Sequence, residues 1–350
     1  MDWNEIPLAK DPPNFDDLLR ALNRQTPSRP TLFEFFLNER LYLRLVPEVK
    51  TYPTDVQEDA QVKILANRRL GYDFATLLIP RFDFREGIIF RRQGRTISLN
   101  EGSVIGSRAD LDAFPWPDAE TADYDILARL ADDLPKGMKL IPYTPDGLLE
   151  NATELVGYQN LCMLIKDDPQ LAEDIFDAIG SRLARYYERA TRYETVGACI
   201  VNDDWGFKTQ SMFSPRDMRR FVFPWTKRFV EIIHAAGKPA ILHSCGYFEH
   251  IIEDVIEALK FDGRHSYEDN ILPVEQAYER YGGRIAILGG IDVDFICRSS
   301  PEEVYARSRA MLERAAGRGG YAHGSGNSIP DYVPDTGYFA MIRAALDHRM

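Results

Sequence analysis

The sequence has few cysteines, and no spacing suggests that they pair. Its 350 residues contain four, at positions 162, 199, 245 and 297, and no Cys-x-x-Cys pair occurs. Four scattered cysteines are too few for the disulfide framework of a small secreted domain. The first residues, Met-Asp-Trp-Asn-Glu-Ile-Pro, have neither the basic nor the apolar region of a secretory signal. These absences predict a cytoplasmic protein.

Two further absences exclude classes of partner. No apolar run approaches the roughly 20 residues that span a bilayer, so we expect no membrane insertion. Lys and Arg number 42 against 54 Asp and Glu, which gives a formal net charge of −12. This balance argues against binding to nucleic acid or an anionic membrane, because both need clustered positive charge. The expected ligand is a small-molecule substrate.

The chain does contain a regular alternation of short apolar or β-branched runs with longer helical patterns. This alternation is typical of βα units around a parallel sheet. The eight runs are Thr31–Phe36, Phe74–Ile79, Leu140–Tyr143, Gly197–Asn202, Pro239–His243, Phe261–His265, Arg284–Gly290 and Gly320–Ser325. They predict an α/β fold, with residues 1–350 forming a single (β/α)8 TIM-barrel domain, a common size for this fold. A short helix near residues 15–23 forms an N-terminal helical extension.

Helix-boundary signals support this count. Ser214-Pro215 and Ser300-Pro301 each place Ser at an N-cap and Pro at the first helical position. One segment interrupts the alternation, because residues 83–117 contain two strand-like runs, Gly87–Arg92 and Arg95–Leu99. We interpret this segment as a β-hairpin insertion in a βα loop, which could cover the mouth of the barrel.

Polar residues gather at the predicted carboxyl ends of the strands, where barrel enzymes carry their catalytic groups. The candidate catalytic residues are Asp203, Asp204, His265 and Glu268. The candidate substrate-binding residues are Glu34, Asn38, Trp205, Tyr267, Asp292, Ser325 and Asn327. Their convergence from several strands predicts an active site on one face of the barrel.

The pair His243-x-Cys245, at the end of the fifth run, is the most specific chemical feature. Residues i and i+2 of a strand point the same way, so an imidazole and a thiolate could share one metal ion. A catalytic zinc needs three protein ligands and an open position. The candidates for the third ligand are Asp203, Asp204, Glu268 and His323. Alternatively, His243 is a hydrogen-bonded barrel histidine and Cys245 a small buried residue.

The acidic candidates also have alternative interpretations. Asp203 and Asp204 could supply a general base or anchor a cationic group. Adjacent strand residues point to opposite faces, so at most one of the two should face the barrel mouth while the other caps a loop. Glu268 could orient His243 or accept a substrate proton, or it could decorate a helix N-terminus.

Several motifs in order resemble the uroporphyrinogen decarboxylase superfamily, closest to its cobalamin- and coenzyme M-linked methyltransferase branch. They are Ser-Arg-Pro-Thr-Leu-Phe-Glu-Phe from Ser28, Asn-Asp-Asp-Trp-Gly from Asn202, Gly-Lys-Pro-x-x-Leu-His-Ser-Cys-Gly from Gly237, His-Ser-Tyr-Glu from His265, Leu-Gly-Gly-Ile-Asp from Leu288 and Gly-Ser-Gly-Asn-Ser-Ile-Pro from Gly324. The resemblance runs from about Phe15 to the C-terminus. It implies a TIM barrel and a methyl transfer in which the corrinoid is carried on a partner protein.

In these methyltransferases a His-x-Cys pair and a distant second Cys bind zinc. His243 and Cys245 match the first part, but Gly324-Ser325-Gly326 stands where the second Cys is expected. A zinc site here would need His323 or a carboxylate such as Glu268 or Asp204. The arginine-rich Arg-Gln-Ala-Gly-Arg motif of uroporphyrinogen decarboxylases is also missing, and Arg40 alone cannot replace its clamp on substrate carboxylates.

Three functions are compatible with the sequence. The first is methyl transfer between a small methylated substrate and a corrinoid or thiol acceptor, with His243 and Cys245 in the site. The second is metal-free decarboxylation of a uroporphyrinogen-like or other carboxylated substrate, dependent on Asp203 or Asp204. The third is a corrinoid- or ligand-binding module that has no catalytic activity.

Overall fold

The computed structural model describes residues 1–85 and 103–349 and contains two parallel sheets. The first sheet pairs β1 (Phe74–Leu78) with β2 (Lys139–Tyr143). The second has five strands in chain order, β3 (Cys199–Asn202), β4 (Ala240–His243), β5 (Gly263–His265), β6 (Ala286–Leu288) and β7 (Tyr321–Ala322). All neighbouring strands are parallel, as expected when a helical segment returns the chain between them.

Backbone bridges join the two sheets to each other and the last strand to the first run. Leu140 of β2 pairs with Val196, just before β3, and Leu32 pairs with His323, just after β7. The N–H of Phe33 also donates to the carbonyl of His323 at 2.8 Å. The eight predicted runs therefore lie in their expected order, and the fold is a (β/α)8 TIM barrel.

The predicted strands are longer than the observed ones. The run Thr31–Phe36 forms a single bridge to the last strand rather than a strand, and the carbonyl of Phe35 accepts the Thr76 hydroxyl at 2.5 Å instead of a ladder N–H. The run Arg284–Gly290 is shortened at its end because Gly289 and Gly290 adopt φ values of 66° and 111°, outside the extended region.

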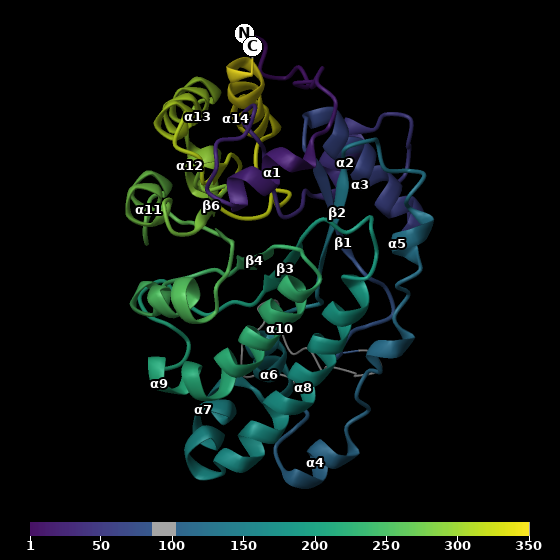
Figure 1. Cartoon of the computed structure of the whole chain (residues 1–350), viewed down its shortest axis with the longest axis vertical. Coiled ribbons are helices and arrows are strands. Elements are labelled where there is room, and N and C mark those ends of the chain that lie inside the picture. The colour runs from purple at the N-terminus through teal and green to yellow at the C-terminus, as the bar shows by residue number, and fades with distance from the viewer. Residues whose placement is uncertain (86–102, 350) are drawn as a thin grey trace.

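Fourteen α-helices lie in the described residues and surround the strands (Figure 1). They are α1 (Phe15–Leu22), α2 (Glu39–Leu45), α3 (Val56–Leu70), α4 (Arg108–Ala113), α5 (Ile126–Arg129), α6 (Leu148–Val156), α7 (Tyr158–Asp167), α8 (Pro169–Ala190), α9 (Pro215–Asp217), α10 (Phe223–Ala235), α11 (Val274–Tyr281), α12 (Val293–Arg298), α13 (Pro301–Ala315) and α14 (Asp335–His348). Both termini lie at the end of the molecule where α13 and α14 pack together (Figure 1). None of the helices in residues 1–85 and 103–349 combines the length and apolar content needed to cross a membrane.

The predicted helix boundaries are confirmed. The Ser214 side chain accepts the N–H of Asp217 at the start of α9, and Ser300 forms a capping box with Glu303 at the start of α13. The N-terminal extension is α1. The predicted hairpin runs, Gly87–Arg92 and Arg95–Leu99, lie outside the described residues.

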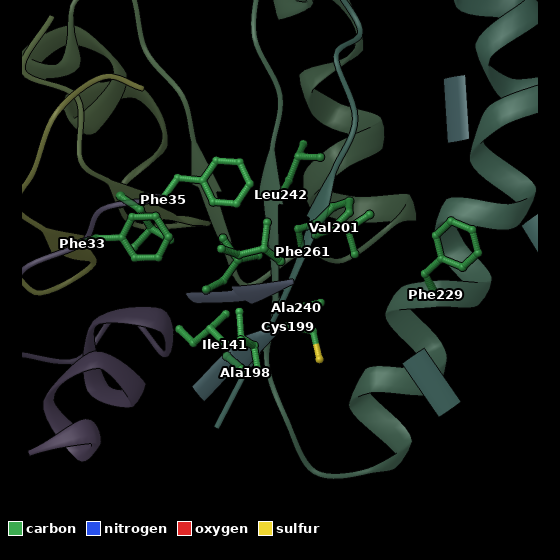
Figure 2. Close-up of a cluster of buried hydrophobic side chains, with 14 of the residues drawn as sticks. Phe33, Phe35, Ile141, Ala198, Cys199, Val201, Phe229, Ala240, Leu242 and Phe261 are labelled. Carbon is green, nitrogen blue, oxygen red and sulfur yellow. The ribbon is translucent and has the colours of Figure 1, made fainter. Parts of the chain in front are cut away.

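Apolar side chains fill the barrel below the strand ends. Figure 2 shows Phe33 and Phe35 of the first run near Ile141 of β2, Val201 of β3 and Leu242 of β4. All five are buried. This packed core supports the polar residues that follow the strands.

Candidate active site

A cavity of about 1150 Å³ lies at the carboxyl ends of the strands. The last residues of β1, β2, β3 and β4 all line it, so it opens on the catalytic face of the barrel. Its lining includes Phe35, Phe36, Asp55, Val56, Gln57, Leu78, Arg81, Asp83, Arg85, Asp123, Arg129, Tyr143, Asp146, Glu150, Asn202, Asp204, His243, Cys245, Asn327 and Ser328.

Asp204, His243 and Cys245 converge in this cavity, with one donor atom from each residue within 4.8 Å of the others. Strand pairing explains the convergence, because Asn202 of β3 is in register with His243 of β4. The residues two positions further on, Asp204 and Cys245, are then neighbours. The N–H of Cys245 donates to Asp204 Oδ1 at 2.9 Å. Of the third ligands considered from the sequence, the structure brings Asp204 to the pair.

A hydrogen-bond chain fixes the tautomer of His243. Its Nδ1 lies 2.7 Å from His265 Nδ1, and His265 Nε2 lies 3.2 Å from the carbonyl oxygen of Ser325. A carbonyl only accepts, so His265 carries its proton on Nε2 and accepts at Nδ1. His243 must then donate from Nδ1, which leaves the Nε2 lone pair 3.9 Å from Cys245 Sγ. This inner hydrogen bond is the arrangement that orients a metal-binding histidine.

Burial keeps both imidazoles neutral. It lowers the pKa of His243 well below its usual value and that of His265 to about 4. A neutral imidazole is the form that binds a metal. His265, a predicted catalytic residue, is fully buried and contacts His243 rather than lining the cavity.

The Cys245 thiol has two polar neighbours on its other sides. Asn327 Nδ2 lies 3.2 Å from Sγ and the Ser266 hydroxyl 3.8 Å. Burial, and then the Asp204 carboxylate, raise the pKa of this thiol. A cation held between Asp204 and Cys245 would instead lower the pKa of the thiol. Nitrogen, sulfur and carboxylate oxygen are the donor atoms that zinc binds in proteins. The residues present therefore fit a zinc ion.

Ser325, which stands where the resemblance implies a second cysteine ligand, is turned away from the triad. Its hydroxyl donates to Glu34 Oε1 at 2.7 Å and its N–H to Oε2 at 3.3 Å. Both residues are buried, and burial raises the pKa of Glu34 to about 8. Neither residue lines the main cavity, and their role as substrate-binding residues stays a prediction. The same loop instead presents Asn327 to Cys245.

Asp203 points away from the cavity, as expected for one member of an adjacent pair. Its carboxylate accepts the N–H groups of Leu149 and Glu150 at 2.9 and 3.0 Å and the indole N–H of Trp205 at 2.8 Å. It therefore caps the first turn of α6. Asp203 and Trp205 are both buried in the protein rather than facing a substrate.

The other predicted site residues lie apart from the triad. Asn38 caps α2, and Asp292 caps α12. His323 is buried, with Nδ1 3.0 Å from the Tyr321 hydroxyl. Tyr267, Glu268 and Asp292 line a second cavity of about 710 Å³, which shares Asn327 and Ser328 with the first.

The sequence analysis did not predict most of the residues that line the main cavity, among them Phe36, Arg81, Tyr143, Asp146 and Glu150. Tyr143 is the last residue of β2, and Asp146 follows three residues later. Both could have been predicted, because catalytic residues of a barrel lie at the carboxyl ends of its strands. Arg81 and Asp146 have φ values of 62° and 57°, which are uncommon for residues other than glycine. Such backbone strain concentrates at functional sites.

Comparison with known families gives a clear match for the chain. The family model described as uroporphyrinogen decarboxylase (URO-D) matches residues 13–348. The chain belongs to this family. A uroporphyrinogen decarboxylase from Streptomyces coelicolor is 24% identical over 364 residues, which cover 96% of each chain. The match to the protein of that name from Streptomyces avermitilis, also 24% identical, spans 210 residues and 55% of that relative.

Among solved structures, a methyltransferase from Methanosarcina mazei superimposes with a TM-score of 0.71. The match covers 94% of this chain and 97% of that one, at 16% sequence identity. At this identity the likeness supports the shared barrel fold alone. The family contains enzymes, and the choice between transferase and decarboxylase chemistry depends on the site.

Proposed function

We propose that this protein is a methyltransferase of the uroporphyrinogen decarboxylase superfamily. It transfers a methyl group between a small methylated substrate and a corrinoid or thiol acceptor. The observation that carries this proposal is the triad of Asp204, His243 and Cys245, whose three donor atoms lie within 4.8 Å in a cavity of about 1150 Å³.

In the proposed site, Asp204, His243 and Cys245 would hold zinc. When bound, zinc supplies a Lewis acid that polarises a heteroatom or activates a thiol. His243 offers its Nε2 lone pair because His265 accepts the proton of Nδ1. Asp204 is held in place by the N–H of Cys245, and Asn327 donates toward the sulfur. With three protein ligands, such a site would keep a position for a substrate, as catalytic zinc sites do.

The cavity mouth suits a second reactant delivered by a partner. The cavity volume of about 1150 Å³ is slightly above the roughly 300–1,000 Å³ of most small-molecule sites, which leaves room for more than a small methyl donor. Phe36, Val56 and Leu78 line it and are 38%, 40% and 36% exposed. They give the cavity apolar surface that a second reactant can cover. A corrinoid-carrying protein is the proposed partner.

Decarboxylation of a carboxylated substrate is the second candidate function. It is supported by the names of the relatives and by three arginines that line the cavity, Arg81, Arg85 and Arg129. Two of them have acidic partners: Arg85 is 3.1 Å from Asp146, and Arg129 is 2.8 Å from Asp123. A clamp for several substrate carboxylates needs free arginines.

The test measures both reactions on the same zinc-loaded protein. With reduced cobalamin and a panel of methylated donors, visible spectra should report methylcobalamin, and uroporphyrinogen should remain unchanged. Cys245→Ala should lower the rate of methyl transfer by about 100-fold or more, because it removes a proposed metal ligand. Cys297→Ala, a half-buried cysteine outside the main cavity, is the matched control and should stay within about 2-fold of wild type. Zinc-independent consumption of uroporphyrinogen, with no change in the cobalamin spectra, would favour the decarboxylase instead.

A further inference from the structure

Two additional carboxylates line the cavity beside the triad. Asp146 follows β2, and Glu150 lies in the first turn of α6. Burial raises the pKa of both, and repulsion from Asp204 adds to the effect in each case. Arg85 lies 3.1 Å from Asp146, but within the described residues no Lys or Arg pairs with Glu150. Glu150 accepts the N–H of Gly147 at 2.9 Å. A cation bound beside these carboxyl groups would lower their pKa values, so the charged carboxylates and the cation would stabilise each other.

Aromatic side chains line the same part of the cavity. The Phe35 ring lies 4.3 Å from the His243 ring, 4.9 Å from the Tyr143 ring and 4.8 Å from the Phe36 ring, between ring centres. Phe35 therefore contacts the triad directly, and Tyr143 and Phe36 pack against Phe35. The faces of aromatic rings attract cations, and quaternary ammonium groups are bound in such surroundings. Carboxylates beside aromatic rings favour a positively charged ligand over a neutral one.

Arg81 is the exception to this negative lining. It is exposed and lines the cavity. Its charge helps to lower the pKa of Asp123, but the Asp123 carboxylate forms its ion pair with Arg129, and no carboxylate of residues 1–85 or 103–349 forms an ion pair with Arg81. The backbone of Arg81 is left-handed, with a φ of 62°. Arg81 directly follows Pro80, which lies two residues beyond the end of β1. A guanidinium that is outside any ion pair is well suited to binding a carboxylate in a bidentate manner.

We propose that the methyl donor is a zwitterionic N-methylated amino acid of the betaine type. Its ammonium group lies against Phe35, Tyr143 and Glu150, and its carboxylate binds Arg81. This inference rests on the methyl transfer proposed above and names the substrate class of that site.

The chemistry of such a donor balances. The bond between the methyl carbon and the ammonium nitrogen breaks, and its electron pair stays on nitrogen to give a neutral tertiary amine. The acceptor, a reduced corrinoid or a thiolate, supplies the pair for the new bond to carbon. A quaternary nitrogen has no lone pair with which to bind a metal. The donor would therefore be held by the residues named above, and a zinc held by the triad would be available to the acceptor.

The test is a binding measurement that needs no turnover. Isothermal titration compares glycine betaine with 3,3-dimethylbutanoate, which replaces the charged nitrogen by carbon and keeps the shape. With zinc-loaded and with metal-free full-length protein, betaine should bind at least about 10-fold more tightly. Glu150→Gln and Tyr143→Leu should each lower that preference several-fold. Arg81→Gln should weaken both ligands alike, by about 10-fold. Asp112→Asn, which removes an exposed carboxylate on α4, is the matched control and should change neither.

Thermal unfolding of each variant separates a lost contact from a lost fold. Equal affinity for the two ligands, a preference that survives both Glu150→Gln and Tyr143→Leu, or binding of neither ligand would overturn the proposed substrate class. Methyl transfer from neutral donors only would also overturn it, while leaving the proposed function standing. A clear preference for betaine without any methyl transfer would support the ligand assignment and count against the proposed function.

Discussion

Asp203→Ala is expected to lower the free energy of unfolding by about 3 kcal/mol, whereas Asp204→Ala should lower it by no more than about 1 kcal/mol. The two residues are adjacent but do different things. Asp203 is buried and accepts two backbone N–H groups of α6 and the indole N–H of Trp205. Alanine would leave three donors without their acceptor. Asp204 lines the cavity and accepts one N–H, that of Cys245.

Urea denaturation of the two variants, in the presence of a chelator, measures this difference without a contribution from bound metal. Zinc affinity, measured separately on folded protein, should depend on the other residue. Asp204→Ala should lose zinc binding, and Asp203→Ala should retain it. Equal losses of stability, or loss of zinc binding by Asp203→Ala alone, would contradict the assignment of the cap to Asp203 and of the ligand to Asp204.

Glu34→Gln is expected to remove a pH dependence of stability worth roughly 4 kcal/mol between pH 4.5 and 8. Burial raises the pKa of Glu34 from 4.5 to about 8. Between these values the folded protein keeps a proton that the unfolded chain releases. The contribution of Glu34 to stability is therefore complete below pH 4.5, falls as the pH rises, and is lost above pH 8. Glutamine does not titrate, and its carbonyl oxygen can still accept the Ser325 hydroxyl.

The measurement is the free energy of unfolding of wild type and Glu34→Gln at several pH values from 5 to 8.5. The difference between the two proteins isolates Glu34, because other buried acids such as Asp203 contribute equally to both curves. The variant should gain stability relative to wild type as the pH rises. Parallel curves would mean that Glu34 is not desolvated as the structure indicates.

The barrel was predictable because its signals are local. The alternation of apolar runs and capped helices identified seven strands and their order. The prediction of a strand at Thr31–Phe36 was wrong in detail, because the pairing of this run depends on a long-range contact. The carbonyl of Phe35 binds the Thr76 hydroxyl instead of continuing the strand ladder.

The site was predictable only in part, for a related reason. Strand periodicity placed His243 and Cys245 on one side, but the choice of Asp204 depends on the register that pairs Asn202 with His243. No local pattern encodes that register. Glu34 and His265 are buried and do not line the cavity, whereas Glu150 at the start of α6 does. These positions also depend on how distant segments pack.

The most direct test of the central claim is the zinc content of purified protein after incubation with zinc and removal of excess metal. The triad predicts about one zinc per chain for wild type and for Cys297→Ala, and close to none for Cys245→Ala or His243→Ala, with all variants folded. Wild-type protein that stays free of zinc, or Cys245→Ala that retains a full equivalent, would contradict a metal centre at Asp204, His243 and Cys245.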